Sequence, residues 1–383
     1  MDFNLSAEQV MVKDLCRNFA KKEIMPIAEE LDKTGQFPYG VWKKMGDLGI
    51  CGIPFPQECG GGGLDWLSMI IAIEEISRGD ASLGNSLLDS VTLAMNLLCT
   101  FGTEEQKKKW LMPLATGEKI GAFGLTEPQA GSDTSAIQTR AVLEEDEWVI
   151  NGTKQFITNA GLTHNSLAII AAVTGVGEKG KKKASNFIIP TGASGYTFGQ
   201  KYNKMGYRSS ETRELIFDDC RIPKENILGN PDKGISQFLM ALQTSRIGFA
   251  AHSVGLAQAI LDVSLAYAKE RKQFGRNIGE FQAIRFKLAD MLMEIELARL
   301  MVYKAAWQKD QDENYFATST FAKIFASETA KRCADSGVQI HGAYGLMDEY
   351  PISRYWREVK FEEILEGTSE IQRVNIARKV LKL

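Results

Sequence analysis

The sequence predicts an α+β protein in which a β-rich segment separates two helical regions. Apolar residues recur at helical spacing up to about residue 118. Short β-branched runs between Gly, Pro and Asp turns follow to about residue 228, and long helical stretches fill the rest of the chain. We therefore expect three domains: a helical domain over residues 1–118, a β domain over 119–228 and a second helical domain over 229–383.

Composition argues against several classes of protein. The 383 residues carry a net charge of −3 and are 44% apolar, which gives no reason to expect nucleic acid or an anionic membrane as a partner. No targeting segment precedes the first helix and no apolar run approaches the ~18 residues of a membrane span, so we expect a cytoplasmic location. Six scattered cysteines and three separated histidines predict neither disulfides nor a metal site.

The N-terminal region is predicted to be a series of helices. Ser6 and Gln9 have the spacing of a capping box at the start of the first helix. Further helices are expected over residues 64–76 and 83–101, and Thr103 opens another helix with an acidic first turn.

The middle region is predicted to form a β barrel or sandwich. Asn151-Gly152, between two β-rich runs, predicts a hairpin turn. Further strands are expected over residues 166–173, 185–189 and 214–217.

The C-terminal region is predicted to be a bundle of long antiparallel helices. Helical spacing continues over residues 235–269, 281–309 and 316–336, each longer than a typical globular helix.

Candidate functional residues lie in short segments between these helices and strands. Phe123–Asp133 combines small residues, which let backbone N–H groups approach a ligand, with hydroxyl donors. Glu366 stands between an apolar Ile-Leu pair and a Gly-Thr-Ser turn, where a helix cap is the structural alternative. Five segments occur together in the order FGLTEPQAGSD, NGTKQFITN, RKQFG, QIHGAYG and EGTSEIQR. In this order and spacing, the chain resembles the acyl-CoA dehydrogenase family over its whole length.

The resemblance implies a fold and a reaction. The fold has an N-terminal helical domain, a middle β-barrel-like domain and a C-terminal four-helix bundle. The implied reaction is FAD-dependent dehydrogenation of a short- or medium-chain acyl-CoA to the 2-enoyl-CoA, with electrons passed to an electron-transferring flavoprotein. Glu366 matches the base that takes the Cα proton, while a hydride leaves Cβ for flavin N5. Some relatives carry the base on the helix that here contains Gln243-Thr-Ser-Arg246. The resemblance places Ser245 at the equivalent position, and a serine cannot serve as a carboxylate base.

The same resemblance implies binding residues. One wall of the flavin pocket matches Phe123, Leu125, Thr126, Gly131 and Ser132, and the ring is flanked by Phe156 and Thr158. Pyrophosphate contacts from a neighbouring subunit match Arg271, Gln273 and Phe274, and the pocket is completed by Gln339, Gly342, Thr368 and Glu370. Substrate contacts match Ser132, Gln243, Arg246 and Gly367. A cofactor site shared between subunits implies a homotetramer, built as a dimer of dimers.

Asp89 has two interpretations. With Asn85, Thr92 and Asn96 it forms a stripe at helical spacing, which would be solvated or would face another subunit. Alternatively, it is a second base in the acyl pocket, as in the related cyclohexene-carboxyl-CoA dehydrogenases. That match is partial, because those relatives lack the glutamate that Glu366 retains. The second interpretation implies a cyclohexane- or cyclohexene-carboxyl substrate.

Other functions remain open from the sequence. An enoyl-CoA reductase working in the reverse direction inside an electron-bifurcating complex would have the same active site. An oxidase and a non-catalytic scaffold are further alternatives. Decarboxylation of a dicarboxylyl-CoA is disfavoured, because Asp89 would repel the second carboxylate of the substrate.

Overall fold

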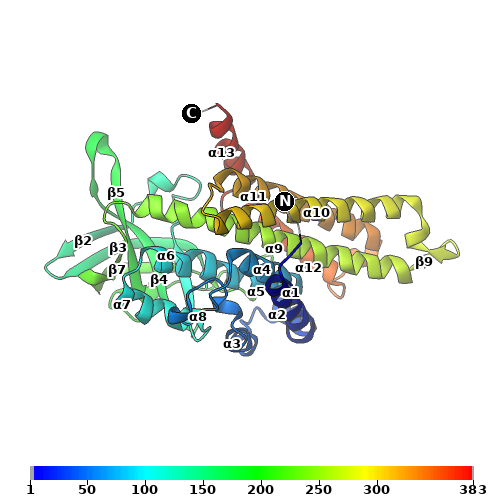
Figure 1. Ribbon diagram of the computed structural model, residues 1–383, viewed down its shortest axis with the longest axis horizontal. Coiled ribbons are helices and arrows are strands. Elements are labelled where there is room, and N and C mark those ends of the chain that lie inside the picture. Colours follow the sequence, from blue (N-terminus) through cyan, green and yellow to red (C-terminus); the bar gives the residue numbers. More distant parts are fainter. Residues whose placement is uncertain (1–3, 382–383) are drawn as a thin grey trace.

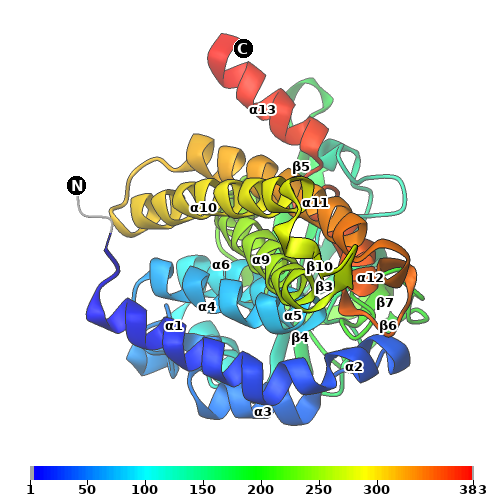
Figure 2. The same ribbon diagram turned by 90° about the vertical axis from the view of Figure 1, so that its right-hand side faces the viewer.

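The computed structural model of the chain describes residues 4–381. Figure 1 shows the β-sheet at one end of the molecule and the long helices α9 and α10 extending to the other end. The last helix, α13, projects from the body (Figures 1 and 2). The predicted helix–sheet–helix order is confirmed.

The N-terminal helices pack around a largely buried pair, α4 and α5. The capping box at the start of α1 is confirmed, because Gln9 N donates to Ser6 Oγ (3.2 Å) and Ser6 N donates to Gln9 Oε1 (2.9 Å). Thr103 and Gln106 form a second capping box. The helices of this region are α1 (Ala7–Phe19), α2 (Ala28–Thr34), α3 (Tyr39–Asp47), α4 (Trp66–Gly79), α5 (Ala81–Asp89), α6 (Asn96–Phe101), α7 (Glu104–Gln106) and α8 (Met112–Ala115).

The stretch predicted as one helix over residues 83–101 is divided by a π-helical segment. Helix α5 begins after Asp80, whose carboxylate accepts from Leu83 N (2.8 Å). The π-helical segment Ser90–Met95 follows Asp89 directly and leads into α6. Such segments are often found at functional sites.

The middle region is a mixed eight-stranded sheet. Its strand order is β6-β7-β3-β2-β4-β5-β8, and β1 pairs in parallel with β4. The strands are β1 (Ile120–Gly124), β2 (Arg140–Glu144), β3 (Glu147–Thr158), β4 (Asn165–Val176), β5 (Lys182–Pro190), β6 (Tyr196–Phe198), β7 (Thr212–Pro223) and β8 (Ile227–Leu228).

The predicted hairpin turn at Asn151-Gly152 is wrong. Both residues lie inside β3, where Asn151 pairs with β2 and Gly152 pairs with β7 across a register shift. Gly152 has φ +145°, and a Cβ there would lie 2.6 Å from Thr139 Oγ1. The glycine therefore serves a bulge and a close approach to a neighbouring segment instead of a turn.

The C-terminal region is the predicted bundle of long helices. Helix α9 packs against α4 on one side and against α10 and α11 on the other, as Figure 2 shows. The elements are α9 (Gly234–Glu270), β9 (Lys272–Gln273), β10 (Arg276–Asn277), α10 (Gln282–Asp310), α11 (Phe316–His341), α12 (Pro351–Glu362) and α13 (Ser369–Leu381).

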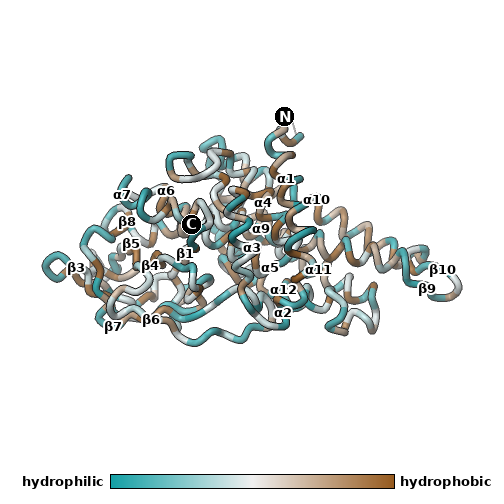
Figure 3. Tube along the Cα trace, turned by 90° about the horizontal axis from the view of Figure 1, so that it is seen from below, coloured by the Kyte–Doolittle hydropathy of each residue, from teal (hydrophilic) through white to brown (hydrophobic). Residues whose placement is uncertain are grey.

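Helix α9 is unusually apolar. By length and composition alone it could cross a membrane, contrary to the sequence expectation, but 72% of its most apolar window is buried inside the protein. That burial is what the central helix of a packed bundle requires. Helix α10 carries more exposed large apolar residues than α9 does. Its apolar stretches are brown in Figure 3.

Candidate active site

Two carboxylates from distant parts of the chain meet in the protein interior. Asp89 is the last residue of α5, and Glu366 lies in the turn between α12 and α13. Burial and the nearby charge of Glu366 raise the pKa of Asp89 to about 7. Asp89 is only 9% exposed, and the other members of its stripe, Asn85, Thr92 and Asn96, are buried as well. The interpretation of this stripe as a solvated helix face is therefore wrong.

Thr158, at the end of β3, faces Asp89. A hydrogen bond from its side chain lowers the pKa of Asp89 and partly offsets the effect of burial. The next residue, Asn159, has φ +65° and donates through Nδ2 to Ser86 O (3.0 Å) and Gly121 O (3.3 Å). These bonds tie the end of β3 to α5 and β1, and so hold Thr158 against the carboxylate.

Glu366 does not cap a helix. Helix α12 ends at Glu362, and Glu366 itself has φ +57°, which is a strained backbone conformation for a residue other than glycine. Gln372 Nε2 donates to the carbonyl oxygens of Glu366 (3.1 Å) and Gly367 (3.0 Å). The strained turn is therefore fixed by hydrogen bonds from outside it.

The side chain of Glu366 is held in a dry environment. The residue as a whole is partly buried, but its Oε2 atom is fully buried and has no hydrogen-bond partner among the described residues. Burial raises the pKa of Glu366, while Ser245, Arg246 and Lys323 oppose the shift. A carboxylate of raised pKa in a site without water suits proton abstraction from a weak carbon acid.

Polar groups without partners surround this carboxylate. Arg246 Nε, on α9, is buried and unpaired within residues 4–381, as is Glu366 Oε2. Ser245, also buried on α9, directs its hydroxyl at the Glu366 carboxylate. Since buried polar atoms are almost always hydrogen-bonded, such a group of unpaired atoms indicates where a polar ligand would bind. Gln243, one turn earlier on α9, is half-buried, and Gly367 follows the base directly.

The residues predicted to contact the flavin ring form a surface that suits a planar aromatic group with polar edges. Phe156 has φ +60° and leaves 59% of its surface exposed, although it is a large apolar residue. Gln155 N donates to Thr126 O (2.8 Å), which brings Thr126 alongside Phe156. Gly131 borders open space, since a Cβ there would meet nothing within 4 Å. Exposed ring surface beside hydroxyl groups suits FAD.

The remaining members of this wall differ in accessibility. Phe123 is half-buried and stacks on Phe238 with ring centroids 4.4 Å apart. Leu125 is buried and Ser132 is exposed. Thr368 accepts from Ile371 N (3.2 Å) at the start of α13, where Glu370 is exposed.

A second cluster of predicted cofactor residues lies elsewhere on the same chain. Arg271, Gln273 and Phe274 are at the β9–β10 hairpin, which lies at the end of the molecule opposite the sheet (Figure 1). Phe274 is 92% exposed, and the Arg271 guanidinium lies 5.2 Å from the Tyr344 ring centre. That contact joins this hairpin to the turn after α11, which begins at the exposed Gly342. Gln339, in the last turn of α11, is exposed as well. One copy of the chain therefore does not bring the two clusters together.

Sequence reasoning missed a buried polar cluster next to the carboxylates. Glu362 Oε1 lies 2.9 Å from His252 Nδ1, and Glu362 also accepts hydrogen bonds from Tyr207 and Ser253. Burial alone would lower the pKa of His252, but the carboxylate of Glu362 outweighs that effect and the pKa is raised.

Lys323, fully buried on α11, is close enough for its charge to act on both Glu362 and Glu366. Its helical spacing from Ser319 and Ala326 was the signal in the sequence that could have placed it on the buried face.

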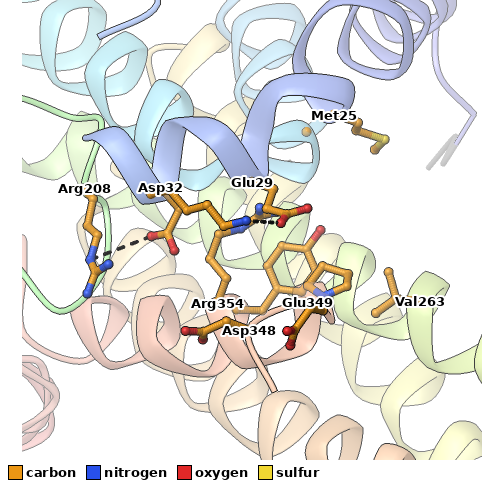
Figure 4. A pocket seen from close by; sticks show the side chains of 12 residues that line it. Met25, Glu29, Asp32, Arg208, Val263, Asp348, Glu349 and Arg354 are labelled. Carbon is orange, nitrogen blue, oxygen red and sulfur yellow. Dashed lines mark hydrogen bonds and ion pairs between the residues drawn. The ribbon is translucent and has the colours of Figure 1, made fainter. Parts of the chain in front are cut away.

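A surface pocket of about 330 Å³ lies away from this site. It is lined in part by Glu29, Asp32, Arg208 and Arg354, with ion pairs from Lys33 to Glu29 and from Arg208 to Asp32 (Figure 4). None of its lining residues belongs to the predicted site. No group of three His, Cys, Asp or Glu side chains with the geometry of a metal site occurs within residues 4–381.

Comparison with known proteins identifies the family. The acyl-CoA dehydrogenase N-terminal domain matches residues 6–118, the middle domain matches residues 122–220 and the C-terminal domain matches residues 232–381. The chain is 52% identical to "Probable acyl-CoA dehydrogenase YngJ" of Bacillus subtilis and 46% identical to "Acyl-CoA dehydrogenase, short-chain specific" of Clostridium acetobutylicum. Each of these matches covers 100% of both chains.

Solved structures agree with this result. The structure of butyryl-CoA dehydrogenase from Megasphaera elsdenii matches with a TM-score of 0.96 and 42% identity. A chain from a study of the electron-transferring flavoprotein of Acidaminococcus fermentans, directed at flavin-based electron bifurcation, matches with a TM-score of 0.97 and 44% identity. Both matches cover 100% of each chain. The chain therefore belongs to the acyl-CoA dehydrogenase family of flavin-dependent oxidoreductases.

Proposed function

We propose that the protein oxidises a short- or medium-chain acyl-CoA thioester to the 2-enoyl-CoA, with Glu366 as the base. The buried Oε2 of Glu366, set beside the buried and unpaired Arg246 Nε, is the observation that carries the proposal. The 46% identity to the short-chain-specific relative and the 42% identity to butyryl-CoA dehydrogenase support a short acyl group.

The reaction begins at the α-carbon of the thioester. Glu366 takes the α-proton as the Cα–H bond breaks, and the desolvation that raises its pKa makes it a stronger base than an exposed carboxylate. Arg246 and Lys323 favour the ionised carboxylate before the transfer, because their charges oppose the upward shift of its pKa. The Gly367 backbone and Ser132 would contact the substrate, and Gln243 and Arg246 would contact its CoA portion.

FAD would be held by the residues of the ring wall. Phe123, Leu125, Thr126, Gly131 and Ser132 contact one side, and Phe156 and Thr158 flank the ring. When bound, FAD supplies the acceptor for the hydride that leaves the β-carbon.

A second copy of the chain would complete the cofactor site. The partly exposed Arg271 and the exposed Gln273 and Phe274 of one copy would contact the FAD of another, together with Gln339 and Gly342. Thr368 and Glu370 would complete the same pocket. The distance between the two clusters within one chain supports this arrangement (Figure 1). Exposed apolar residues on α10, including Met293, Leu297 and Leu300, support association of copies into a homotetramer.

Asp89 supports a second candidate substrate. A carboxyl group that is buried beside the base and has a pKa near 7 can accept a proton at neutral pH, as a second base requires. We therefore include dehydrogenation of cyclohexane- or cyclohexene-carboxyl-CoA, with Asp89 removing a proton further along the ring.

The electron partner we propose is an electron-transferring flavoprotein. The match to a chain from the A. fermentans study supports this partner, and its subject of electron bifurcation also supports the reverse reaction, enoyl-CoA reduction. Co-purification with flavoprotein subunits, followed by rate measurements in both directions, would distinguish the two directions.

A panel of linear, branched and cyclic acyl-CoAs, read by bleaching of the flavin absorbance, tests the proposed function. We expect complete bleaching with at least one linear short-chain thioester and none with free CoA. A purified protein that lacks flavin and cannot be reconstituted with FAD would contradict the proposal. Rapid turnover with oxygen alone, seen as peroxide release, would indicate an oxidase instead.

A further inference from the structure

Lys323 lies directly behind the turn that carries the proposed base. Its side chain is fully buried on α11, and its Nζ donates to the Gly367 carbonyl oxygen at 2.9 Å. Its ammonium group also lies 5.7 Å from the Phe249 ring centre. A buried lysine loses its hydration and is retained in a folded protein only where other groups compensate that loss.

The carbonyl that Lys323 contacts belongs to a strained segment. Glu366 and Gly367 have φ values of +57° and +91°. Gln372 donates to the same Gly367 oxygen and to that of Glu366, so two side chains hold the turn. Gln372 is neutral and Lys323 is a cation, which allows their roles to be separated by experiment.

Charged groups from several elements face Glu366. Asp89 approaches from α5, Arg246 from α9 and Lys323 from α11. The charge of Lys323 interacts with two carboxylates, those of Glu362 and Glu366. Burial lowers the pKa of Lys323 to about 8, and these carboxylates oppose that shift, so the group is largely protonated at pH 7.

We propose that Lys323 is a positioning residue for the α-proton abstraction. Through its bond to the Gly367 carbonyl it fixes the turn, and through its charge it favours the ionised form of Glu366. Arg246 also favours the ionised base but touches no backbone group of the turn in the described residues. Lys323 therefore combines positioning and electrostatic tuning in one side chain. This inference rests on the proposed function, since it concerns the same base.

The test isolates proton abstraction from oxidation. A 3-thiaacyl-CoA has an acidic α-proton but no β-hydrogen, so its exchange with D2O, followed by mass spectrometry, reports only on the base. In Lys323→Met the loss of the charge should raise the apparent pKa of exchange by about one unit, which lowers the rate about tenfold at pH values well below the wild-type pKa and much less above it. The rate should recover as the pH rises above the new pKa.

Two other variants separate charge from structure. Gln372→Met removes two hydrogen bonds from the turn without changing charge, so it should slow exchange equally at every pH. Lys331→Met, at an exposed lysine of the same helix that pairs with Glu363 (3.2 Å), should leave the profile unchanged. If Lys323→Met does not fold, Lys323→Gln serves the same comparison, because its amide can still donate to Gly367.

The outcomes are distinguishable. An unchanged apparent pKa in both neutral Lys323 variants, with exchange by the wild type intact, would overturn the role of Lys323 alone. A wild-type protein that exchanges no faster than Glu366→Gln would instead overturn the proposed function.

Discussion

The carboxylates of Asp89 and Glu366 occupy one buried site although they come from opposite ends of the chain. The charge of Glu366 contributes to the raised pKa of Asp89, which shows that the two groups are coupled. At neutral pH the pair therefore holds fewer negative charges than two exposed carboxylates would. This relationship makes both residues accessible to specific tests.

The first prediction concerns Glu366→Gln. The amide cannot accept the α-proton, so we expect α,β-dehydrogenation to fall about 10³-fold or more, while the flavin remains bound. Steady-state rates and the flavin-to-protein absorbance ratio measure both quantities. Glu363→Gln is the matched control, because Glu363 pairs with Lys331 and Lys360 on the surface side of the same segment. Near-normal turnover in Glu366→Gln would contradict the base assignment.

The second prediction separates the two substrate candidates through Asp89→Asn. If Asp89 is the second base, this variant should retain its turnover rate on linear acyl-CoAs. Its turnover rate on cyclic acyl-CoAs should fall about tenfold or more, because only the ring substrate needs a second proton acceptor. The substrate panel measured on both proteins gives the ratio. Equal losses on linear and cyclic substrates would assign Asp89 to structure alone.

The third prediction concerns stability. The pKa of Asp89 is about 7 in the folded protein against the model-peptide value of 3.8, so the folded state binds a proton over this range that the unfolded state has released. The contribution of Asp89 to stability therefore falls as the pH rises from about 4 to 7.

The same variant removes this loss of stability. Asp89→Asn should gain stability relative to the wild type above pH 7, by a few kcal/mol at most, and the gain should shrink toward pH 4. Thermal unfolding midpoints between pH 4.5 and 8.5 measure the difference, with Asp14→Asn as an exposed control. A gain independent of pH would show that the buried charge is not the cause.

The fourth prediction tests the shared cofactor site. Arg271→Ala should lower FAD retention in gel filtration without changing the fold, since Arg271 directly precedes β9, which lies at the end of the molecule opposite the sheet (Figure 1). Lys272→Ala, the exposed neighbour, is the control. In mixed oligomers of Arg271→Ala and Glu366→Gln chains, some active sites should combine Glu366 from the first chain with Arg271 from the second. These sites hold both native residues, so activity should return. No regain after co-refolding would indicate that each chain binds FAD alone.

Local patterns in the sequence determined much of this protein. Helical spacing and capping residues predicted the N-terminal helices and the bundle, because these signals act within a few residues of one another. The segment EGTSEIQR marked Glu366 as a residue of interest through resemblance to a family. The same kind of reading failed at Asn151-Gly152, because a glycine that serves a bulge and a glycine that serves a turn look alike in one dimension.

Tertiary structure decided the properties that the chemistry needs. Nothing near Asp89 in the sequence indicates whether its stripe meets water or the protein interior, and its pKa depends on Glu366, which only packing brings close. Lys323 looks like any helical lysine until α11 is placed against the turn at Gly367. Burial and Coulomb interactions depend on which segments meet in space, whereas a sequence pattern reports only what lies nearby along the chain.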